Sequence, residues 1–99
     1  MRSRQSSRSQ DLGSSIQRLV EDLGIRKKLA EYEAVLQWDS LVGDHIAKAA
    51  SAVKITKGVL FVRVRNSVWR NELSLRKQEI MNTLNAGLGE EVVKDIRFQ

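Results

Sequence analysis

The sequence predicts a small α+β domain in which helices cover one face of a sheet of about three strands. Apolar residues recur at helical spacing over most of the chain, which predicts helices before and after a central stretch, Gly58 to Trp69. Within that stretch, apolar positions alternate with basic or aromatic ones, as in a strand with one buried face. The alternating residues are Leu60, Phe61, Val62, Arg63, Val64 and Arg65. We expect the order helix, helix, strand, strand, helix, strand, with the second face of the sheet left open.

Length and composition allow one domain and favour an acidic partner. The 99 residues leave little room for a second core, and 17 basic against 12 acidic residues give a net charge of +5. This balance favours nucleic acid or another acidic partner over a neutral partner. The absence of Cys excludes a disulfide and a thiolate metal site. Because no apolar run approaches the ~20 residues of a membrane-spanning helix, we expect no membrane partner and a cytoplasmic protein.

Residues 1–10 are predicted to be a disordered basic arm, and residues 11–99 a single domain. The arm contains Arg2, Arg4 and Arg8 among serines and glutamines, with no apolar residue after Met1. Such a segment cannot bury enough apolar surface to fold. Two interpretations stay open: a terminus that only keeps the protein in solution, and an arm that contacts phosphate groups.

Two helices are predicted before the sheet. The first spans Asp11 to Leu23, and Gly24 is a natural C-terminal stop for it. The second spans about Ile25 to Ala50, with a break or bend marked by Asp39 and Gly43. A basic triplet lies at its start, where positive charge opposes the helix dipole and has no stabilising role. The triplet is Arg26, Lys27 and Lys28.

A hairpin, a long helix and a last strand complete the predicted domain. Ala52 to Thr56 should form a strand with Val53 and Ile55 facing inward, joined by a tight turn at Lys57-Gly58 to the alternating strand. Asn66 or Ser67 should cap a long helix that ends near Ala86-Gly87. The last strand spans Val92 to Gln99, with Ile96 and Phe98 inward and Arg97 outward. The buried stripe of the long helix is Trp69, Leu73, Ile80 and Leu84.

The open sheet face is the strongest functional signal. Its predicted members are Lys54, Thr56, Phe61, Arg63, Arg65 and Arg97. Arginine pairs with phosphate or lies flat on a base, and an aromatic ring stacks on unpaired bases. The alternative is that Phe61 packs on a neighbouring element and that the arginines are simply solvated. Further basic residues, Arg70, Arg76 and Lys77 on the long helix, would extend this face into a stripe if they align with Arg63 and Arg65.

A protein-binding surface is the second candidate site, formed by Lys27, Lys28 and Trp38. Trp38 and Trp69 have the spacing of core residues, whereas an exposed Trp38 would indicate an interface, since Trp is frequent in binding hot spots.

Catalysis has little support in the sequence. His45 is the only histidine, so a nucleophilic triad or a histidine-rich zinc site lacks its partners. Glu90-Glu91 is most simply a solvated turn pair, and Gly87-Leu88-Gly89 follows a helix instead of joining a strand to a helix, as a phosphate-binding loop would. We therefore expect a non-enzyme without a metal or other cofactor.

From Trp38 onward the chain resembles the DciA family of bacterial proteins, over roughly its last two thirds. The resemblance continues through Ile80, Leu84-Asn85 and the closing Ile96-x-Phe98. Its main motifs are Trp38-x-x-Leu41-Val42-Gly43-x-x-Ile46-Ala47 and Gly58-x-Leu60-x-Val62-x-Val64-x-x-Ser67-x-Trp69-x-x-x-Leu73. Each motif alone is weak, whereas their order and spacing together are fairly specific.

The resemblance implies a domain similar to the K-homology nucleic-acid fold, which binds DNA and loads or assists the bacterial replicative helicase without hydrolysing anything itself. The chain departs from the K-homology pattern because it has no Gly-x-x-Gly loop. Any DNA contact must therefore come from the sheet, the helices or the arm. The residues that match are mainly core and turn positions, so the resemblance assigns no binding residue.

Three functions stay open at this point. The first is a nucleic-acid-binding adaptor that binds DNA and the replicative helicase in replication initiation. The second is a protein-interaction module whose basic surface meets an acidic patch on its partner. The third is an RNA-binding module, which shares the charge and the fold and differs only in its ligand.

Overall fold

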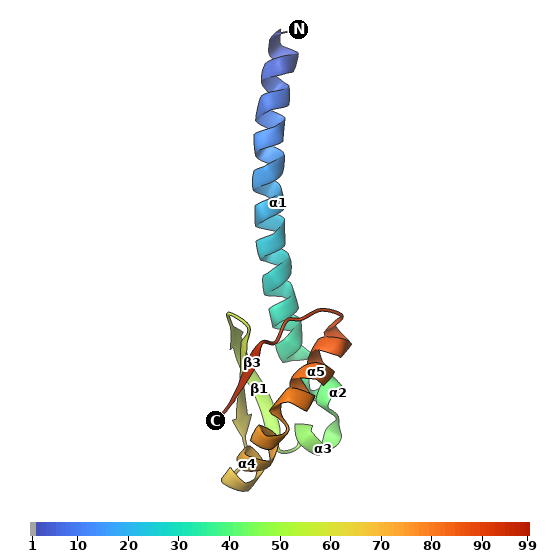
Figure 1. Cartoon of the computed structure of the whole chain (residues 1–99), viewed down its shortest axis with the longest axis vertical. Coiled ribbons are helices and arrows are strands. Elements are labelled where there is room, and N and C mark those ends of the chain that lie inside the picture. Colours follow the sequence, from blue (N-terminus) through green and yellow to red (C-terminus); the bar gives the residue numbers. More distant parts are fainter. Residues whose placement is uncertain (1) are drawn as a thin grey trace.

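The computed structural model describes the backbone of residues 2–99 and the side chains of residues 13–99. Figure 1 shows a small domain in which helices lie on one side of a sheet, with one long helix projecting from it. The predicted α+β class with three strands is confirmed. The elements are α1 (Arg2–Leu36), α2 (Trp38–Val42), α3 (Asp44–Ala47), β1 (Ala50–Thr56), β2 (Val59–Val64), α4 (Ser67–Leu75), α5 (Lys77–Leu88) and β3 (Asp95–Phe98).

The sheet is mixed, with strand order β1-β2-β3. β1 pairs antiparallel with β2, whereas β3 pairs parallel with β2. The predicted turn at Lys57-Gly58 is confirmed, and both residues have positive φ, 51° and 81°, as the turns of two-residue hairpins require. The Gly58 N–H donates to the Glu31 carboxylate at 3.1 Å. The tip of the hairpin is therefore attached to α1.

The core lies between the sheet and the helices. The strands contribute Leu60, Val62 and Ile96, each at most 1% exposed. Trp38 is also 1% exposed, and its indole N–H donates to the carbonyl of Ala50 at 2.9 Å. The remaining buried aliphatic residues of this cluster include Ala34, Ile46, Val64, Leu73, Ile80, Leu84, Val92 and Val93.

The predicted boundaries of the N-terminal helices are wrong. α1 is one unbroken helix through Gly24, because a single glycine costs a helix only about 1 kcal/mol relative to alanine and does not by itself end it. The second predicted helix ends at Leu36, where Trp38 enters the core, and β1 already begins at Ala50. The predicted break at Gly43 is confirmed by its φ of 88°, between α2 and α3.

The prediction that Val53 faces inward is also wrong. The pairing of β1 with β2 shifts by one residue between Ala52 and Lys54, so Val53 is the extra residue of a bulge and is 41% exposed. A bulge reverses the alternation beyond it. For this reason Ile55, not Val53, pairs with the buried Leu60.

The predicted long helix consists of two segments, α4 and α5, separated at Arg76. The Asn66 side chain caps α4 by accepting the Trp69 N–H at 2.9 Å, as predicted. Both segments contact β3, but α4 also contacts β2, whereas α5 also contacts α1 and α2. The last strand is shorter than predicted, but Ile96 is buried and Arg97 is exposed, as expected.

Asn85 holds the connection between α5 and β3, and its replacement should be costly. Its side-chain oxygen accepts the N–H groups of Val92 and Val93 at 3.0 and 2.8 Å, and its amide donates to the Val93 carbonyl at 2.9 Å. We expect Asn85→Ala to lower the free energy of unfolding by about 2 kcal/mol, because part-buried backbone groups lose their partners. Urea unfolding measures this. The control is Asn82→Ala, since Asn82 bonds only the exposed Gln78, and an equal loss in both variants would contradict the argument.

Candidate nucleic-acid interface

The strand register places the predicted basic and aromatic residues on one face of the sheet. In β2 the buried residues alternate with Phe61 and Arg63, which therefore lie on the opposite face. The pairing puts Lys54 of β1 and Arg97 of β3 on either side of Phe61. We call this surface the open face, and its outward positions are Ser51, Lys54, Thr56, Val59, Phe61, Arg63, Asp95 and Arg97.

The centre of the open face is a row across all three strands. Lys54 and Arg97 are exposed, and Phe61 between them is half-buried. The Lys54 ammonium lies 5.1 Å from the centroid of the Phe61 ring, within the range of a cation–π contact. The row thus places two cations beside an aromatic ring. A base that stacks on this ring must displace the flexible Lys54 side chain from it.

A second group of cations surrounds a shallow hollow of about 310 Å³ at the start of β1 and the end of β2. Its basic residues are Lys48, Arg63 and Arg65, all exposed. The Arg65 N–H donates to the Ala49 carbonyl at 2.8 Å, which places the backbone before β1 beside the backbone after β2. We call this hollow the basic hollow.

Lys48 and Ser51 are candidate residues that sequence reasoning missed. Ser51 pairs with Arg63 across the strands, and Lys48 lines the hollow beside it. The sequence contains one usable signal: an antiparallel hairpin with its turn at Lys57-Gly58 brings residues near 50 opposite residues near 64. The predicted strand began at Ala52, which left this region outside the sheet.

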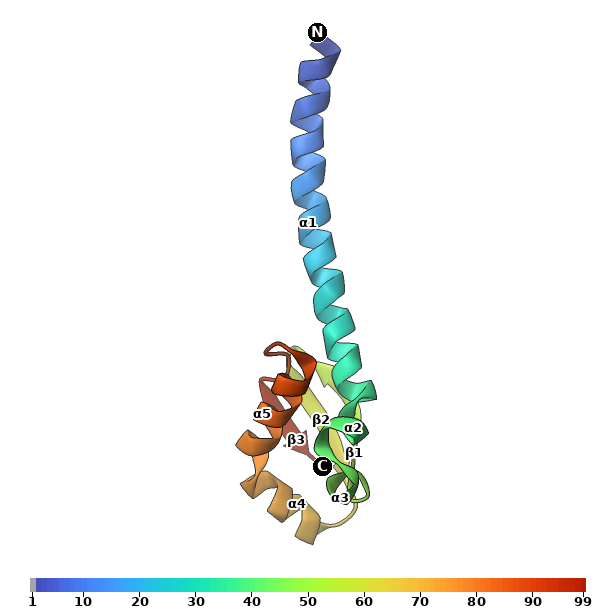
Figure 2. The same cartoon turned by 90° about the vertical axis from the view of Figure 1, so that its right-hand side faces the viewer.

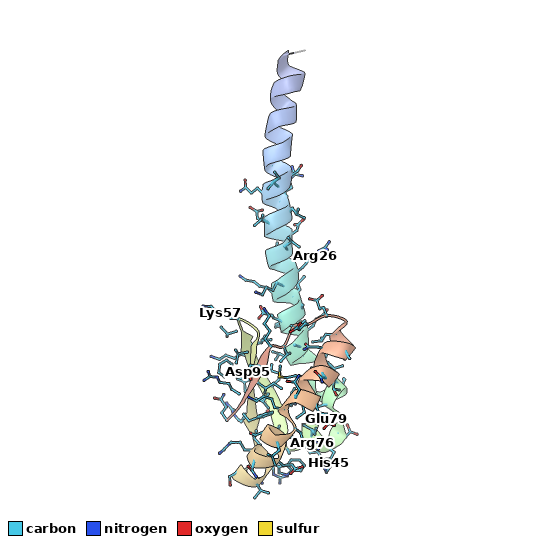
Figure 3. The ribbon with its side chains drawn as sticks, in the orientation of Figure 1. Arg26, His45, Lys57, Arg76, Glu79 and Asp95 are labelled. Atoms are coloured by element: carbon cyan, nitrogen blue, oxygen red, sulfur yellow. The ribbon has the colours of Figure 1, made fainter. Side chains whose placement is uncertain are left out.

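The three basic residues predicted on the long helix differ in their partners. Arg76 lies at the junction of α4 and α5, where its guanidinium is 3.5 Å from the Glu79 carboxylate. Lys77 is paired with Asp95 at 3.0 Å. Figure 3 shows Arg76 and Glu79 on the helical side of the domain. Arg70 is exposed on α4, and no contact described in the structure joins it to the basic hollow.

The ion pair with Lys77 favours the ionised form of Asp95, which is the one carboxylate on the open face. The hydrogen bond from Lys77 is the largest of the effects that lower the pKa of Asp95, followed by the N–H of Ile96, while partial burial opposes them. A carboxylate whose pKa is lower in the folded state stabilises that state at pH values above its pKa in the unfolded chain, which is about 3.9. This contribution to stability is lost as the pH falls through the pKa of the folded state.

We therefore expect Asp95→Asn to be less stable than the native chain near pH 7, by at most about 1 kcal/mol because both partners are solvent-exposed. The difference should disappear at acid pH, below about pH 4. Urea unfolding across a pH series measures it. Glu79→Gln, which removes the longer pair with Arg76, serves as the control. A deficit of Asp95→Asn that persists at low pH would contradict the electrostatic explanation.

The residues predicted to bind a partner protein do not lie together in the structure. Lys27 and Lys28 line a groove of about 690 Å³ between α1 and β1, together with Tyr32 and Val53. Trp38 is buried in the core, so it offers no surface to a partner, and its assignment to an interface is wrong. Arg2, Arg4 and Arg8 belong to the part of α1 whose side chains lie outside the described residues, and their contact with phosphate stays a prediction.

His45 packs against an aromatic ring. Its ring meets that of Trp69 edge-on, with centroids 5.2 Å apart, and this contact joins α3 to α4. Within the described part of the chain, no three His, Asp or Glu side chains are grouped as a metal site would require. None of the described helices is long and apolar enough to cross a membrane.

The fold and this surface define a small α+β domain with a helix-covered mixed sheet and a basic open face. Comparison with known proteins is more specific: the model of the family described as "Dna[CI] antecedent, DciA" matches residues 11–98. The chain belongs to the DciA family.

Curated relatives agree with the family assignment. A UPF0232 protein of Mycobacterium tuberculosis (strain H37Rv) is 27% identical over 89 residues, which cover 90% of this chain and 48% of that protein. A UPF0232 protein of Mycobacterium leprae (strain TN) is 30% identical over 90% of this chain and 47% of its own length. The chain therefore spans about half the length of the curated relatives that it matches.

Proposed function

We propose that this chain is a non-catalytic, DNA-binding adaptor that helps to load or assist the bacterial replicative helicase. Family membership supports the helicase-related role. The single observation that supports DNA binding is the open face, where Lys54, Arg63 and Arg97 lie around Phe61 on neighbouring strands. Its only carboxylate, Asp95, is paired with Lys77, so the rest of the face presents positive charge to a partner.

The arrangement suits a single strand better than a rigid duplex. Arg63 lines the basic hollow and is the next outward residue after Phe61 on β2, so a flexible backbone can follow the cations from Arg97 to Arg65. Phosphate groups would bind the guanidinium groups, which form paired hydrogen bonds with phosphate oxygens. One base would cover Phe61, a stacking contact that tolerates any sequence. We therefore expect little sequence preference and a strong dependence on salt.

A titration tests this proposal. The full chain and a form lacking residues 1–10 are titrated into labelled single-stranded DNA at two salt concentrations, with duplex DNA and single-stranded RNA as competitors. We expect binding that weakens steeply with salt and survives the truncation, which would assign the site to the folded domain. Loss of binding on truncation would assign it to the basic arm. No binding by either form at low salt would overturn the DNA-binding proposal, and preference for RNA would favour the RNA-binding alternative.

The helicase part of the proposal is tested separately. Purified chain is mixed with the purified bacterial replicative helicase in the absence of DNA, and complex formation is measured by light scattering. Association in this experiment, together with no DNA binding in the titration, would favour a protein-interaction module. Absence of association would overturn the adaptor function even if the open face binds DNA.

A further inference from the structure

The groove of about 690 Å³ between α1 and β1, which we call the α1–β1 groove, has an exposed apolar surface. Tyr32 and Val35 contribute to this surface from α1, and Val53 and Ile55 contribute to it from β1. Tyr32 is 62% exposed and Val53 is 41% exposed. Figure 2 shows the last turns of α1 on the side of the domain that carries β1, with most of α5 on the other side. An exposed apolar hollow of this kind is typical of a binding site.

The border of the α1–β1 groove is basic. The lysines that line it are all exposed, and the ion pairs recorded for the described side chains include none of them. Glu31 is the one carboxylate that lines the groove, and it already accepts the N–H of Gly58 at 3.1 Å. A segment that carries both carboxylates and apolar side chains would complement this surface. The four groove lysines are Lys27, Lys28, Lys54 and Lys57.

The pairing of β2 shows which backbone groups of β1 point away from the sheet. The N–H of Val64 donates to the Gln99 carbonyl at 2.7 Å, and the Val62 carbonyl accepts the N–H of Gln99 at 2.8 Å. These β2 residues therefore form hydrogen bonds toward β3. Because the direction of hydrogen bonding alternates along a strand, Leu60 also bonds toward β3. Ile55, the β1 partner of Leu60, then points its own N–H and carbonyl away from β2.

This outward edge of β1 is open at the groove. Ala50, which is paired with Val64, obeys the same alternation, and its outward carbonyl accepts the indole N–H of Trp38. The hydrogen bonds of the described residues include no comparable partner for Ile55, which lines the groove. β1 is also an edge strand, in the sheet order β1-β2-β3. Such an edge is a template for an extended segment of another chain.

We propose that the α1–β1 groove binds an extended, acidic segment of a partner protein, which pairs with the edge of β1 at Ile55. In an added strand, successive side chains point to opposite faces of the sheet. Apolar side chains of the segment would lie between Tyr32 and Val53, and its carboxylates would face the groove lysines. The bulge at Val53 bends β1, so the added strand is confined to the part of β1 near the hairpin turn. This inference does not depend on DNA binding.

A nucleic-acid strand is the other class of occupant that the groove lysines would attract. The apolar surface argues against it, because Val35, Val53 and Ile55 present aliphatic groups, whereas bases stack on aromatic rings. The free N–H and carbonyl of Ile55 also match the backbone of an extended peptide. The open face and the α1–β1 groove therefore differ in the chemistry of the partner they accept.

A selection from a library of displayed random peptides tests the proposal, with the full chain as bait. We expect the enriched peptides to alternate apolar residues with Asp or Glu. Their affinity should fall by at least about tenfold for Val53→Glu, because a carboxylate then faces an acidic peptide. The matched control is Val68→Glu on α4, since Val68 is 77% exposed and does not line the groove. Enrichment of no acidic peptide, or an equal affinity for both variants, would overturn the proposal.

Charge reversal on α1 separates the groove lysines from net charge. Lys27→Glu combined with Lys28→Glu should abolish binding of the selected peptide. Arg18→Glu combined with Arg26→Glu makes the same change of charge on the same helix, but neither arginine lines the groove, so this variant should bind nearly as well as the native chain. Equal losses in the two variants would overturn the groove as the site. Displacement of the peptide by single-stranded DNA, together with weaker DNA binding by Val53→Glu, would assign the groove to nucleic acid instead.

Amide hydrogen exchange, followed by nuclear magnetic resonance, tests the pairing with β1. The N–H of Ile55 should exchange rapidly in the free chain and become protected when the selected peptide is bound. The N–H of Phe61 is the internal control, because it faces β1 within the sheet and should be protected in both states. Exchange at Ile55 that is unchanged by a bound peptide would overturn the added strand.

Discussion

Replacing Arg63 and Arg97 together with alanine should lower the affinity for single-stranded DNA by roughly 100-fold at low salt. Each guanidinium is exposed on the open face with no carboxylate partner recorded in the structure, and a hydrogen bond to a charged group contributes about 1.5 kcal/mol. The dependence on salt should also become weaker. For single strands, the slope of log affinity against log salt changes by about 0.7 for each phosphate contact removed, hence by roughly 1.4 for two.

The control for this prediction removes the same charge elsewhere. Arg18→Ala combined with Arg26→Ala also deletes two guanidinium groups, but from the projecting helix α1, where Figure 3 shows Arg26 beyond the hairpin turn at Lys57. Fluorescence anisotropy with labelled DNA measures both variants. If both lose affinity equally, binding follows net charge and the open face is not a defined site. Phe61→Leu separates stacking from charge, because it should weaken binding without changing the salt slope.

Replacing Trp38 with alanine should cause the largest loss of stability, about 3–5 kcal/mol. The side chain is 1% exposed and lies in the cluster that joins α1, β1 and β2. Its removal leaves a large cavity and deprives the Ala50 carbonyl of its indole donor. The midpoint and slope of urea unfolding, followed by circular dichroism, measure the loss.

Trp69 provides the matched control for Trp38. Trp38→Phe should lower the free energy of unfolding more than Trp69→Phe, because Trp69 is only half-buried and its indole N–H has no partner recorded in the structure. Equal losses in the two variants would mean that the hydrogen bond to the Ala50 carbonyl contributes no stability beyond that of the buried apolar volume. The bond also bears on the candidate site, since Ala50 lines the basic hollow. Trp38→Phe should therefore weaken DNA binding slightly even when the chain remains folded.

The local pattern of the sequence predicts the sheet and the open face well. Leu60 and Val62 alternate with Phe61 and Arg63, and because β2 is the central strand its alternation is kept by pairing on both sides. The turn at Lys57-Gly58 was predictable from Gly58, because glycine readily adopts the positive φ that a two-residue hairpin turn requires, whereas the positive φ of Lys57 is unusual for a residue with a side chain.

Features that depend on distant contacts were not predictable from spacing. The bulge at Val53 arises from the pairing of β1 with β2 and has no local sequence signal. The end of α1 at Leu36 depends on burial of Trp38, whereas Gly24, the stronger local stop signal, lies inside the helix. Lys48 joins the candidate site only because β1 begins earlier than the apolar alternation suggests.

The parallel pairing of β2 with β3 determines the order in which the domain can assemble. β1 and β2 are neighbours in sequence and close through a two-residue turn, whereas β3 reaches β2 only after α4 and α5 have crossed the sheet. Closing a long loop costs more chain entropy than closing a short one, so we expect the hairpin to form early in folding and β3 to dock last. Destabilising changes in the hairpin should slow refolding, and changes in β3 should mainly accelerate unfolding. Arg97 would then complete the open face only at the final step.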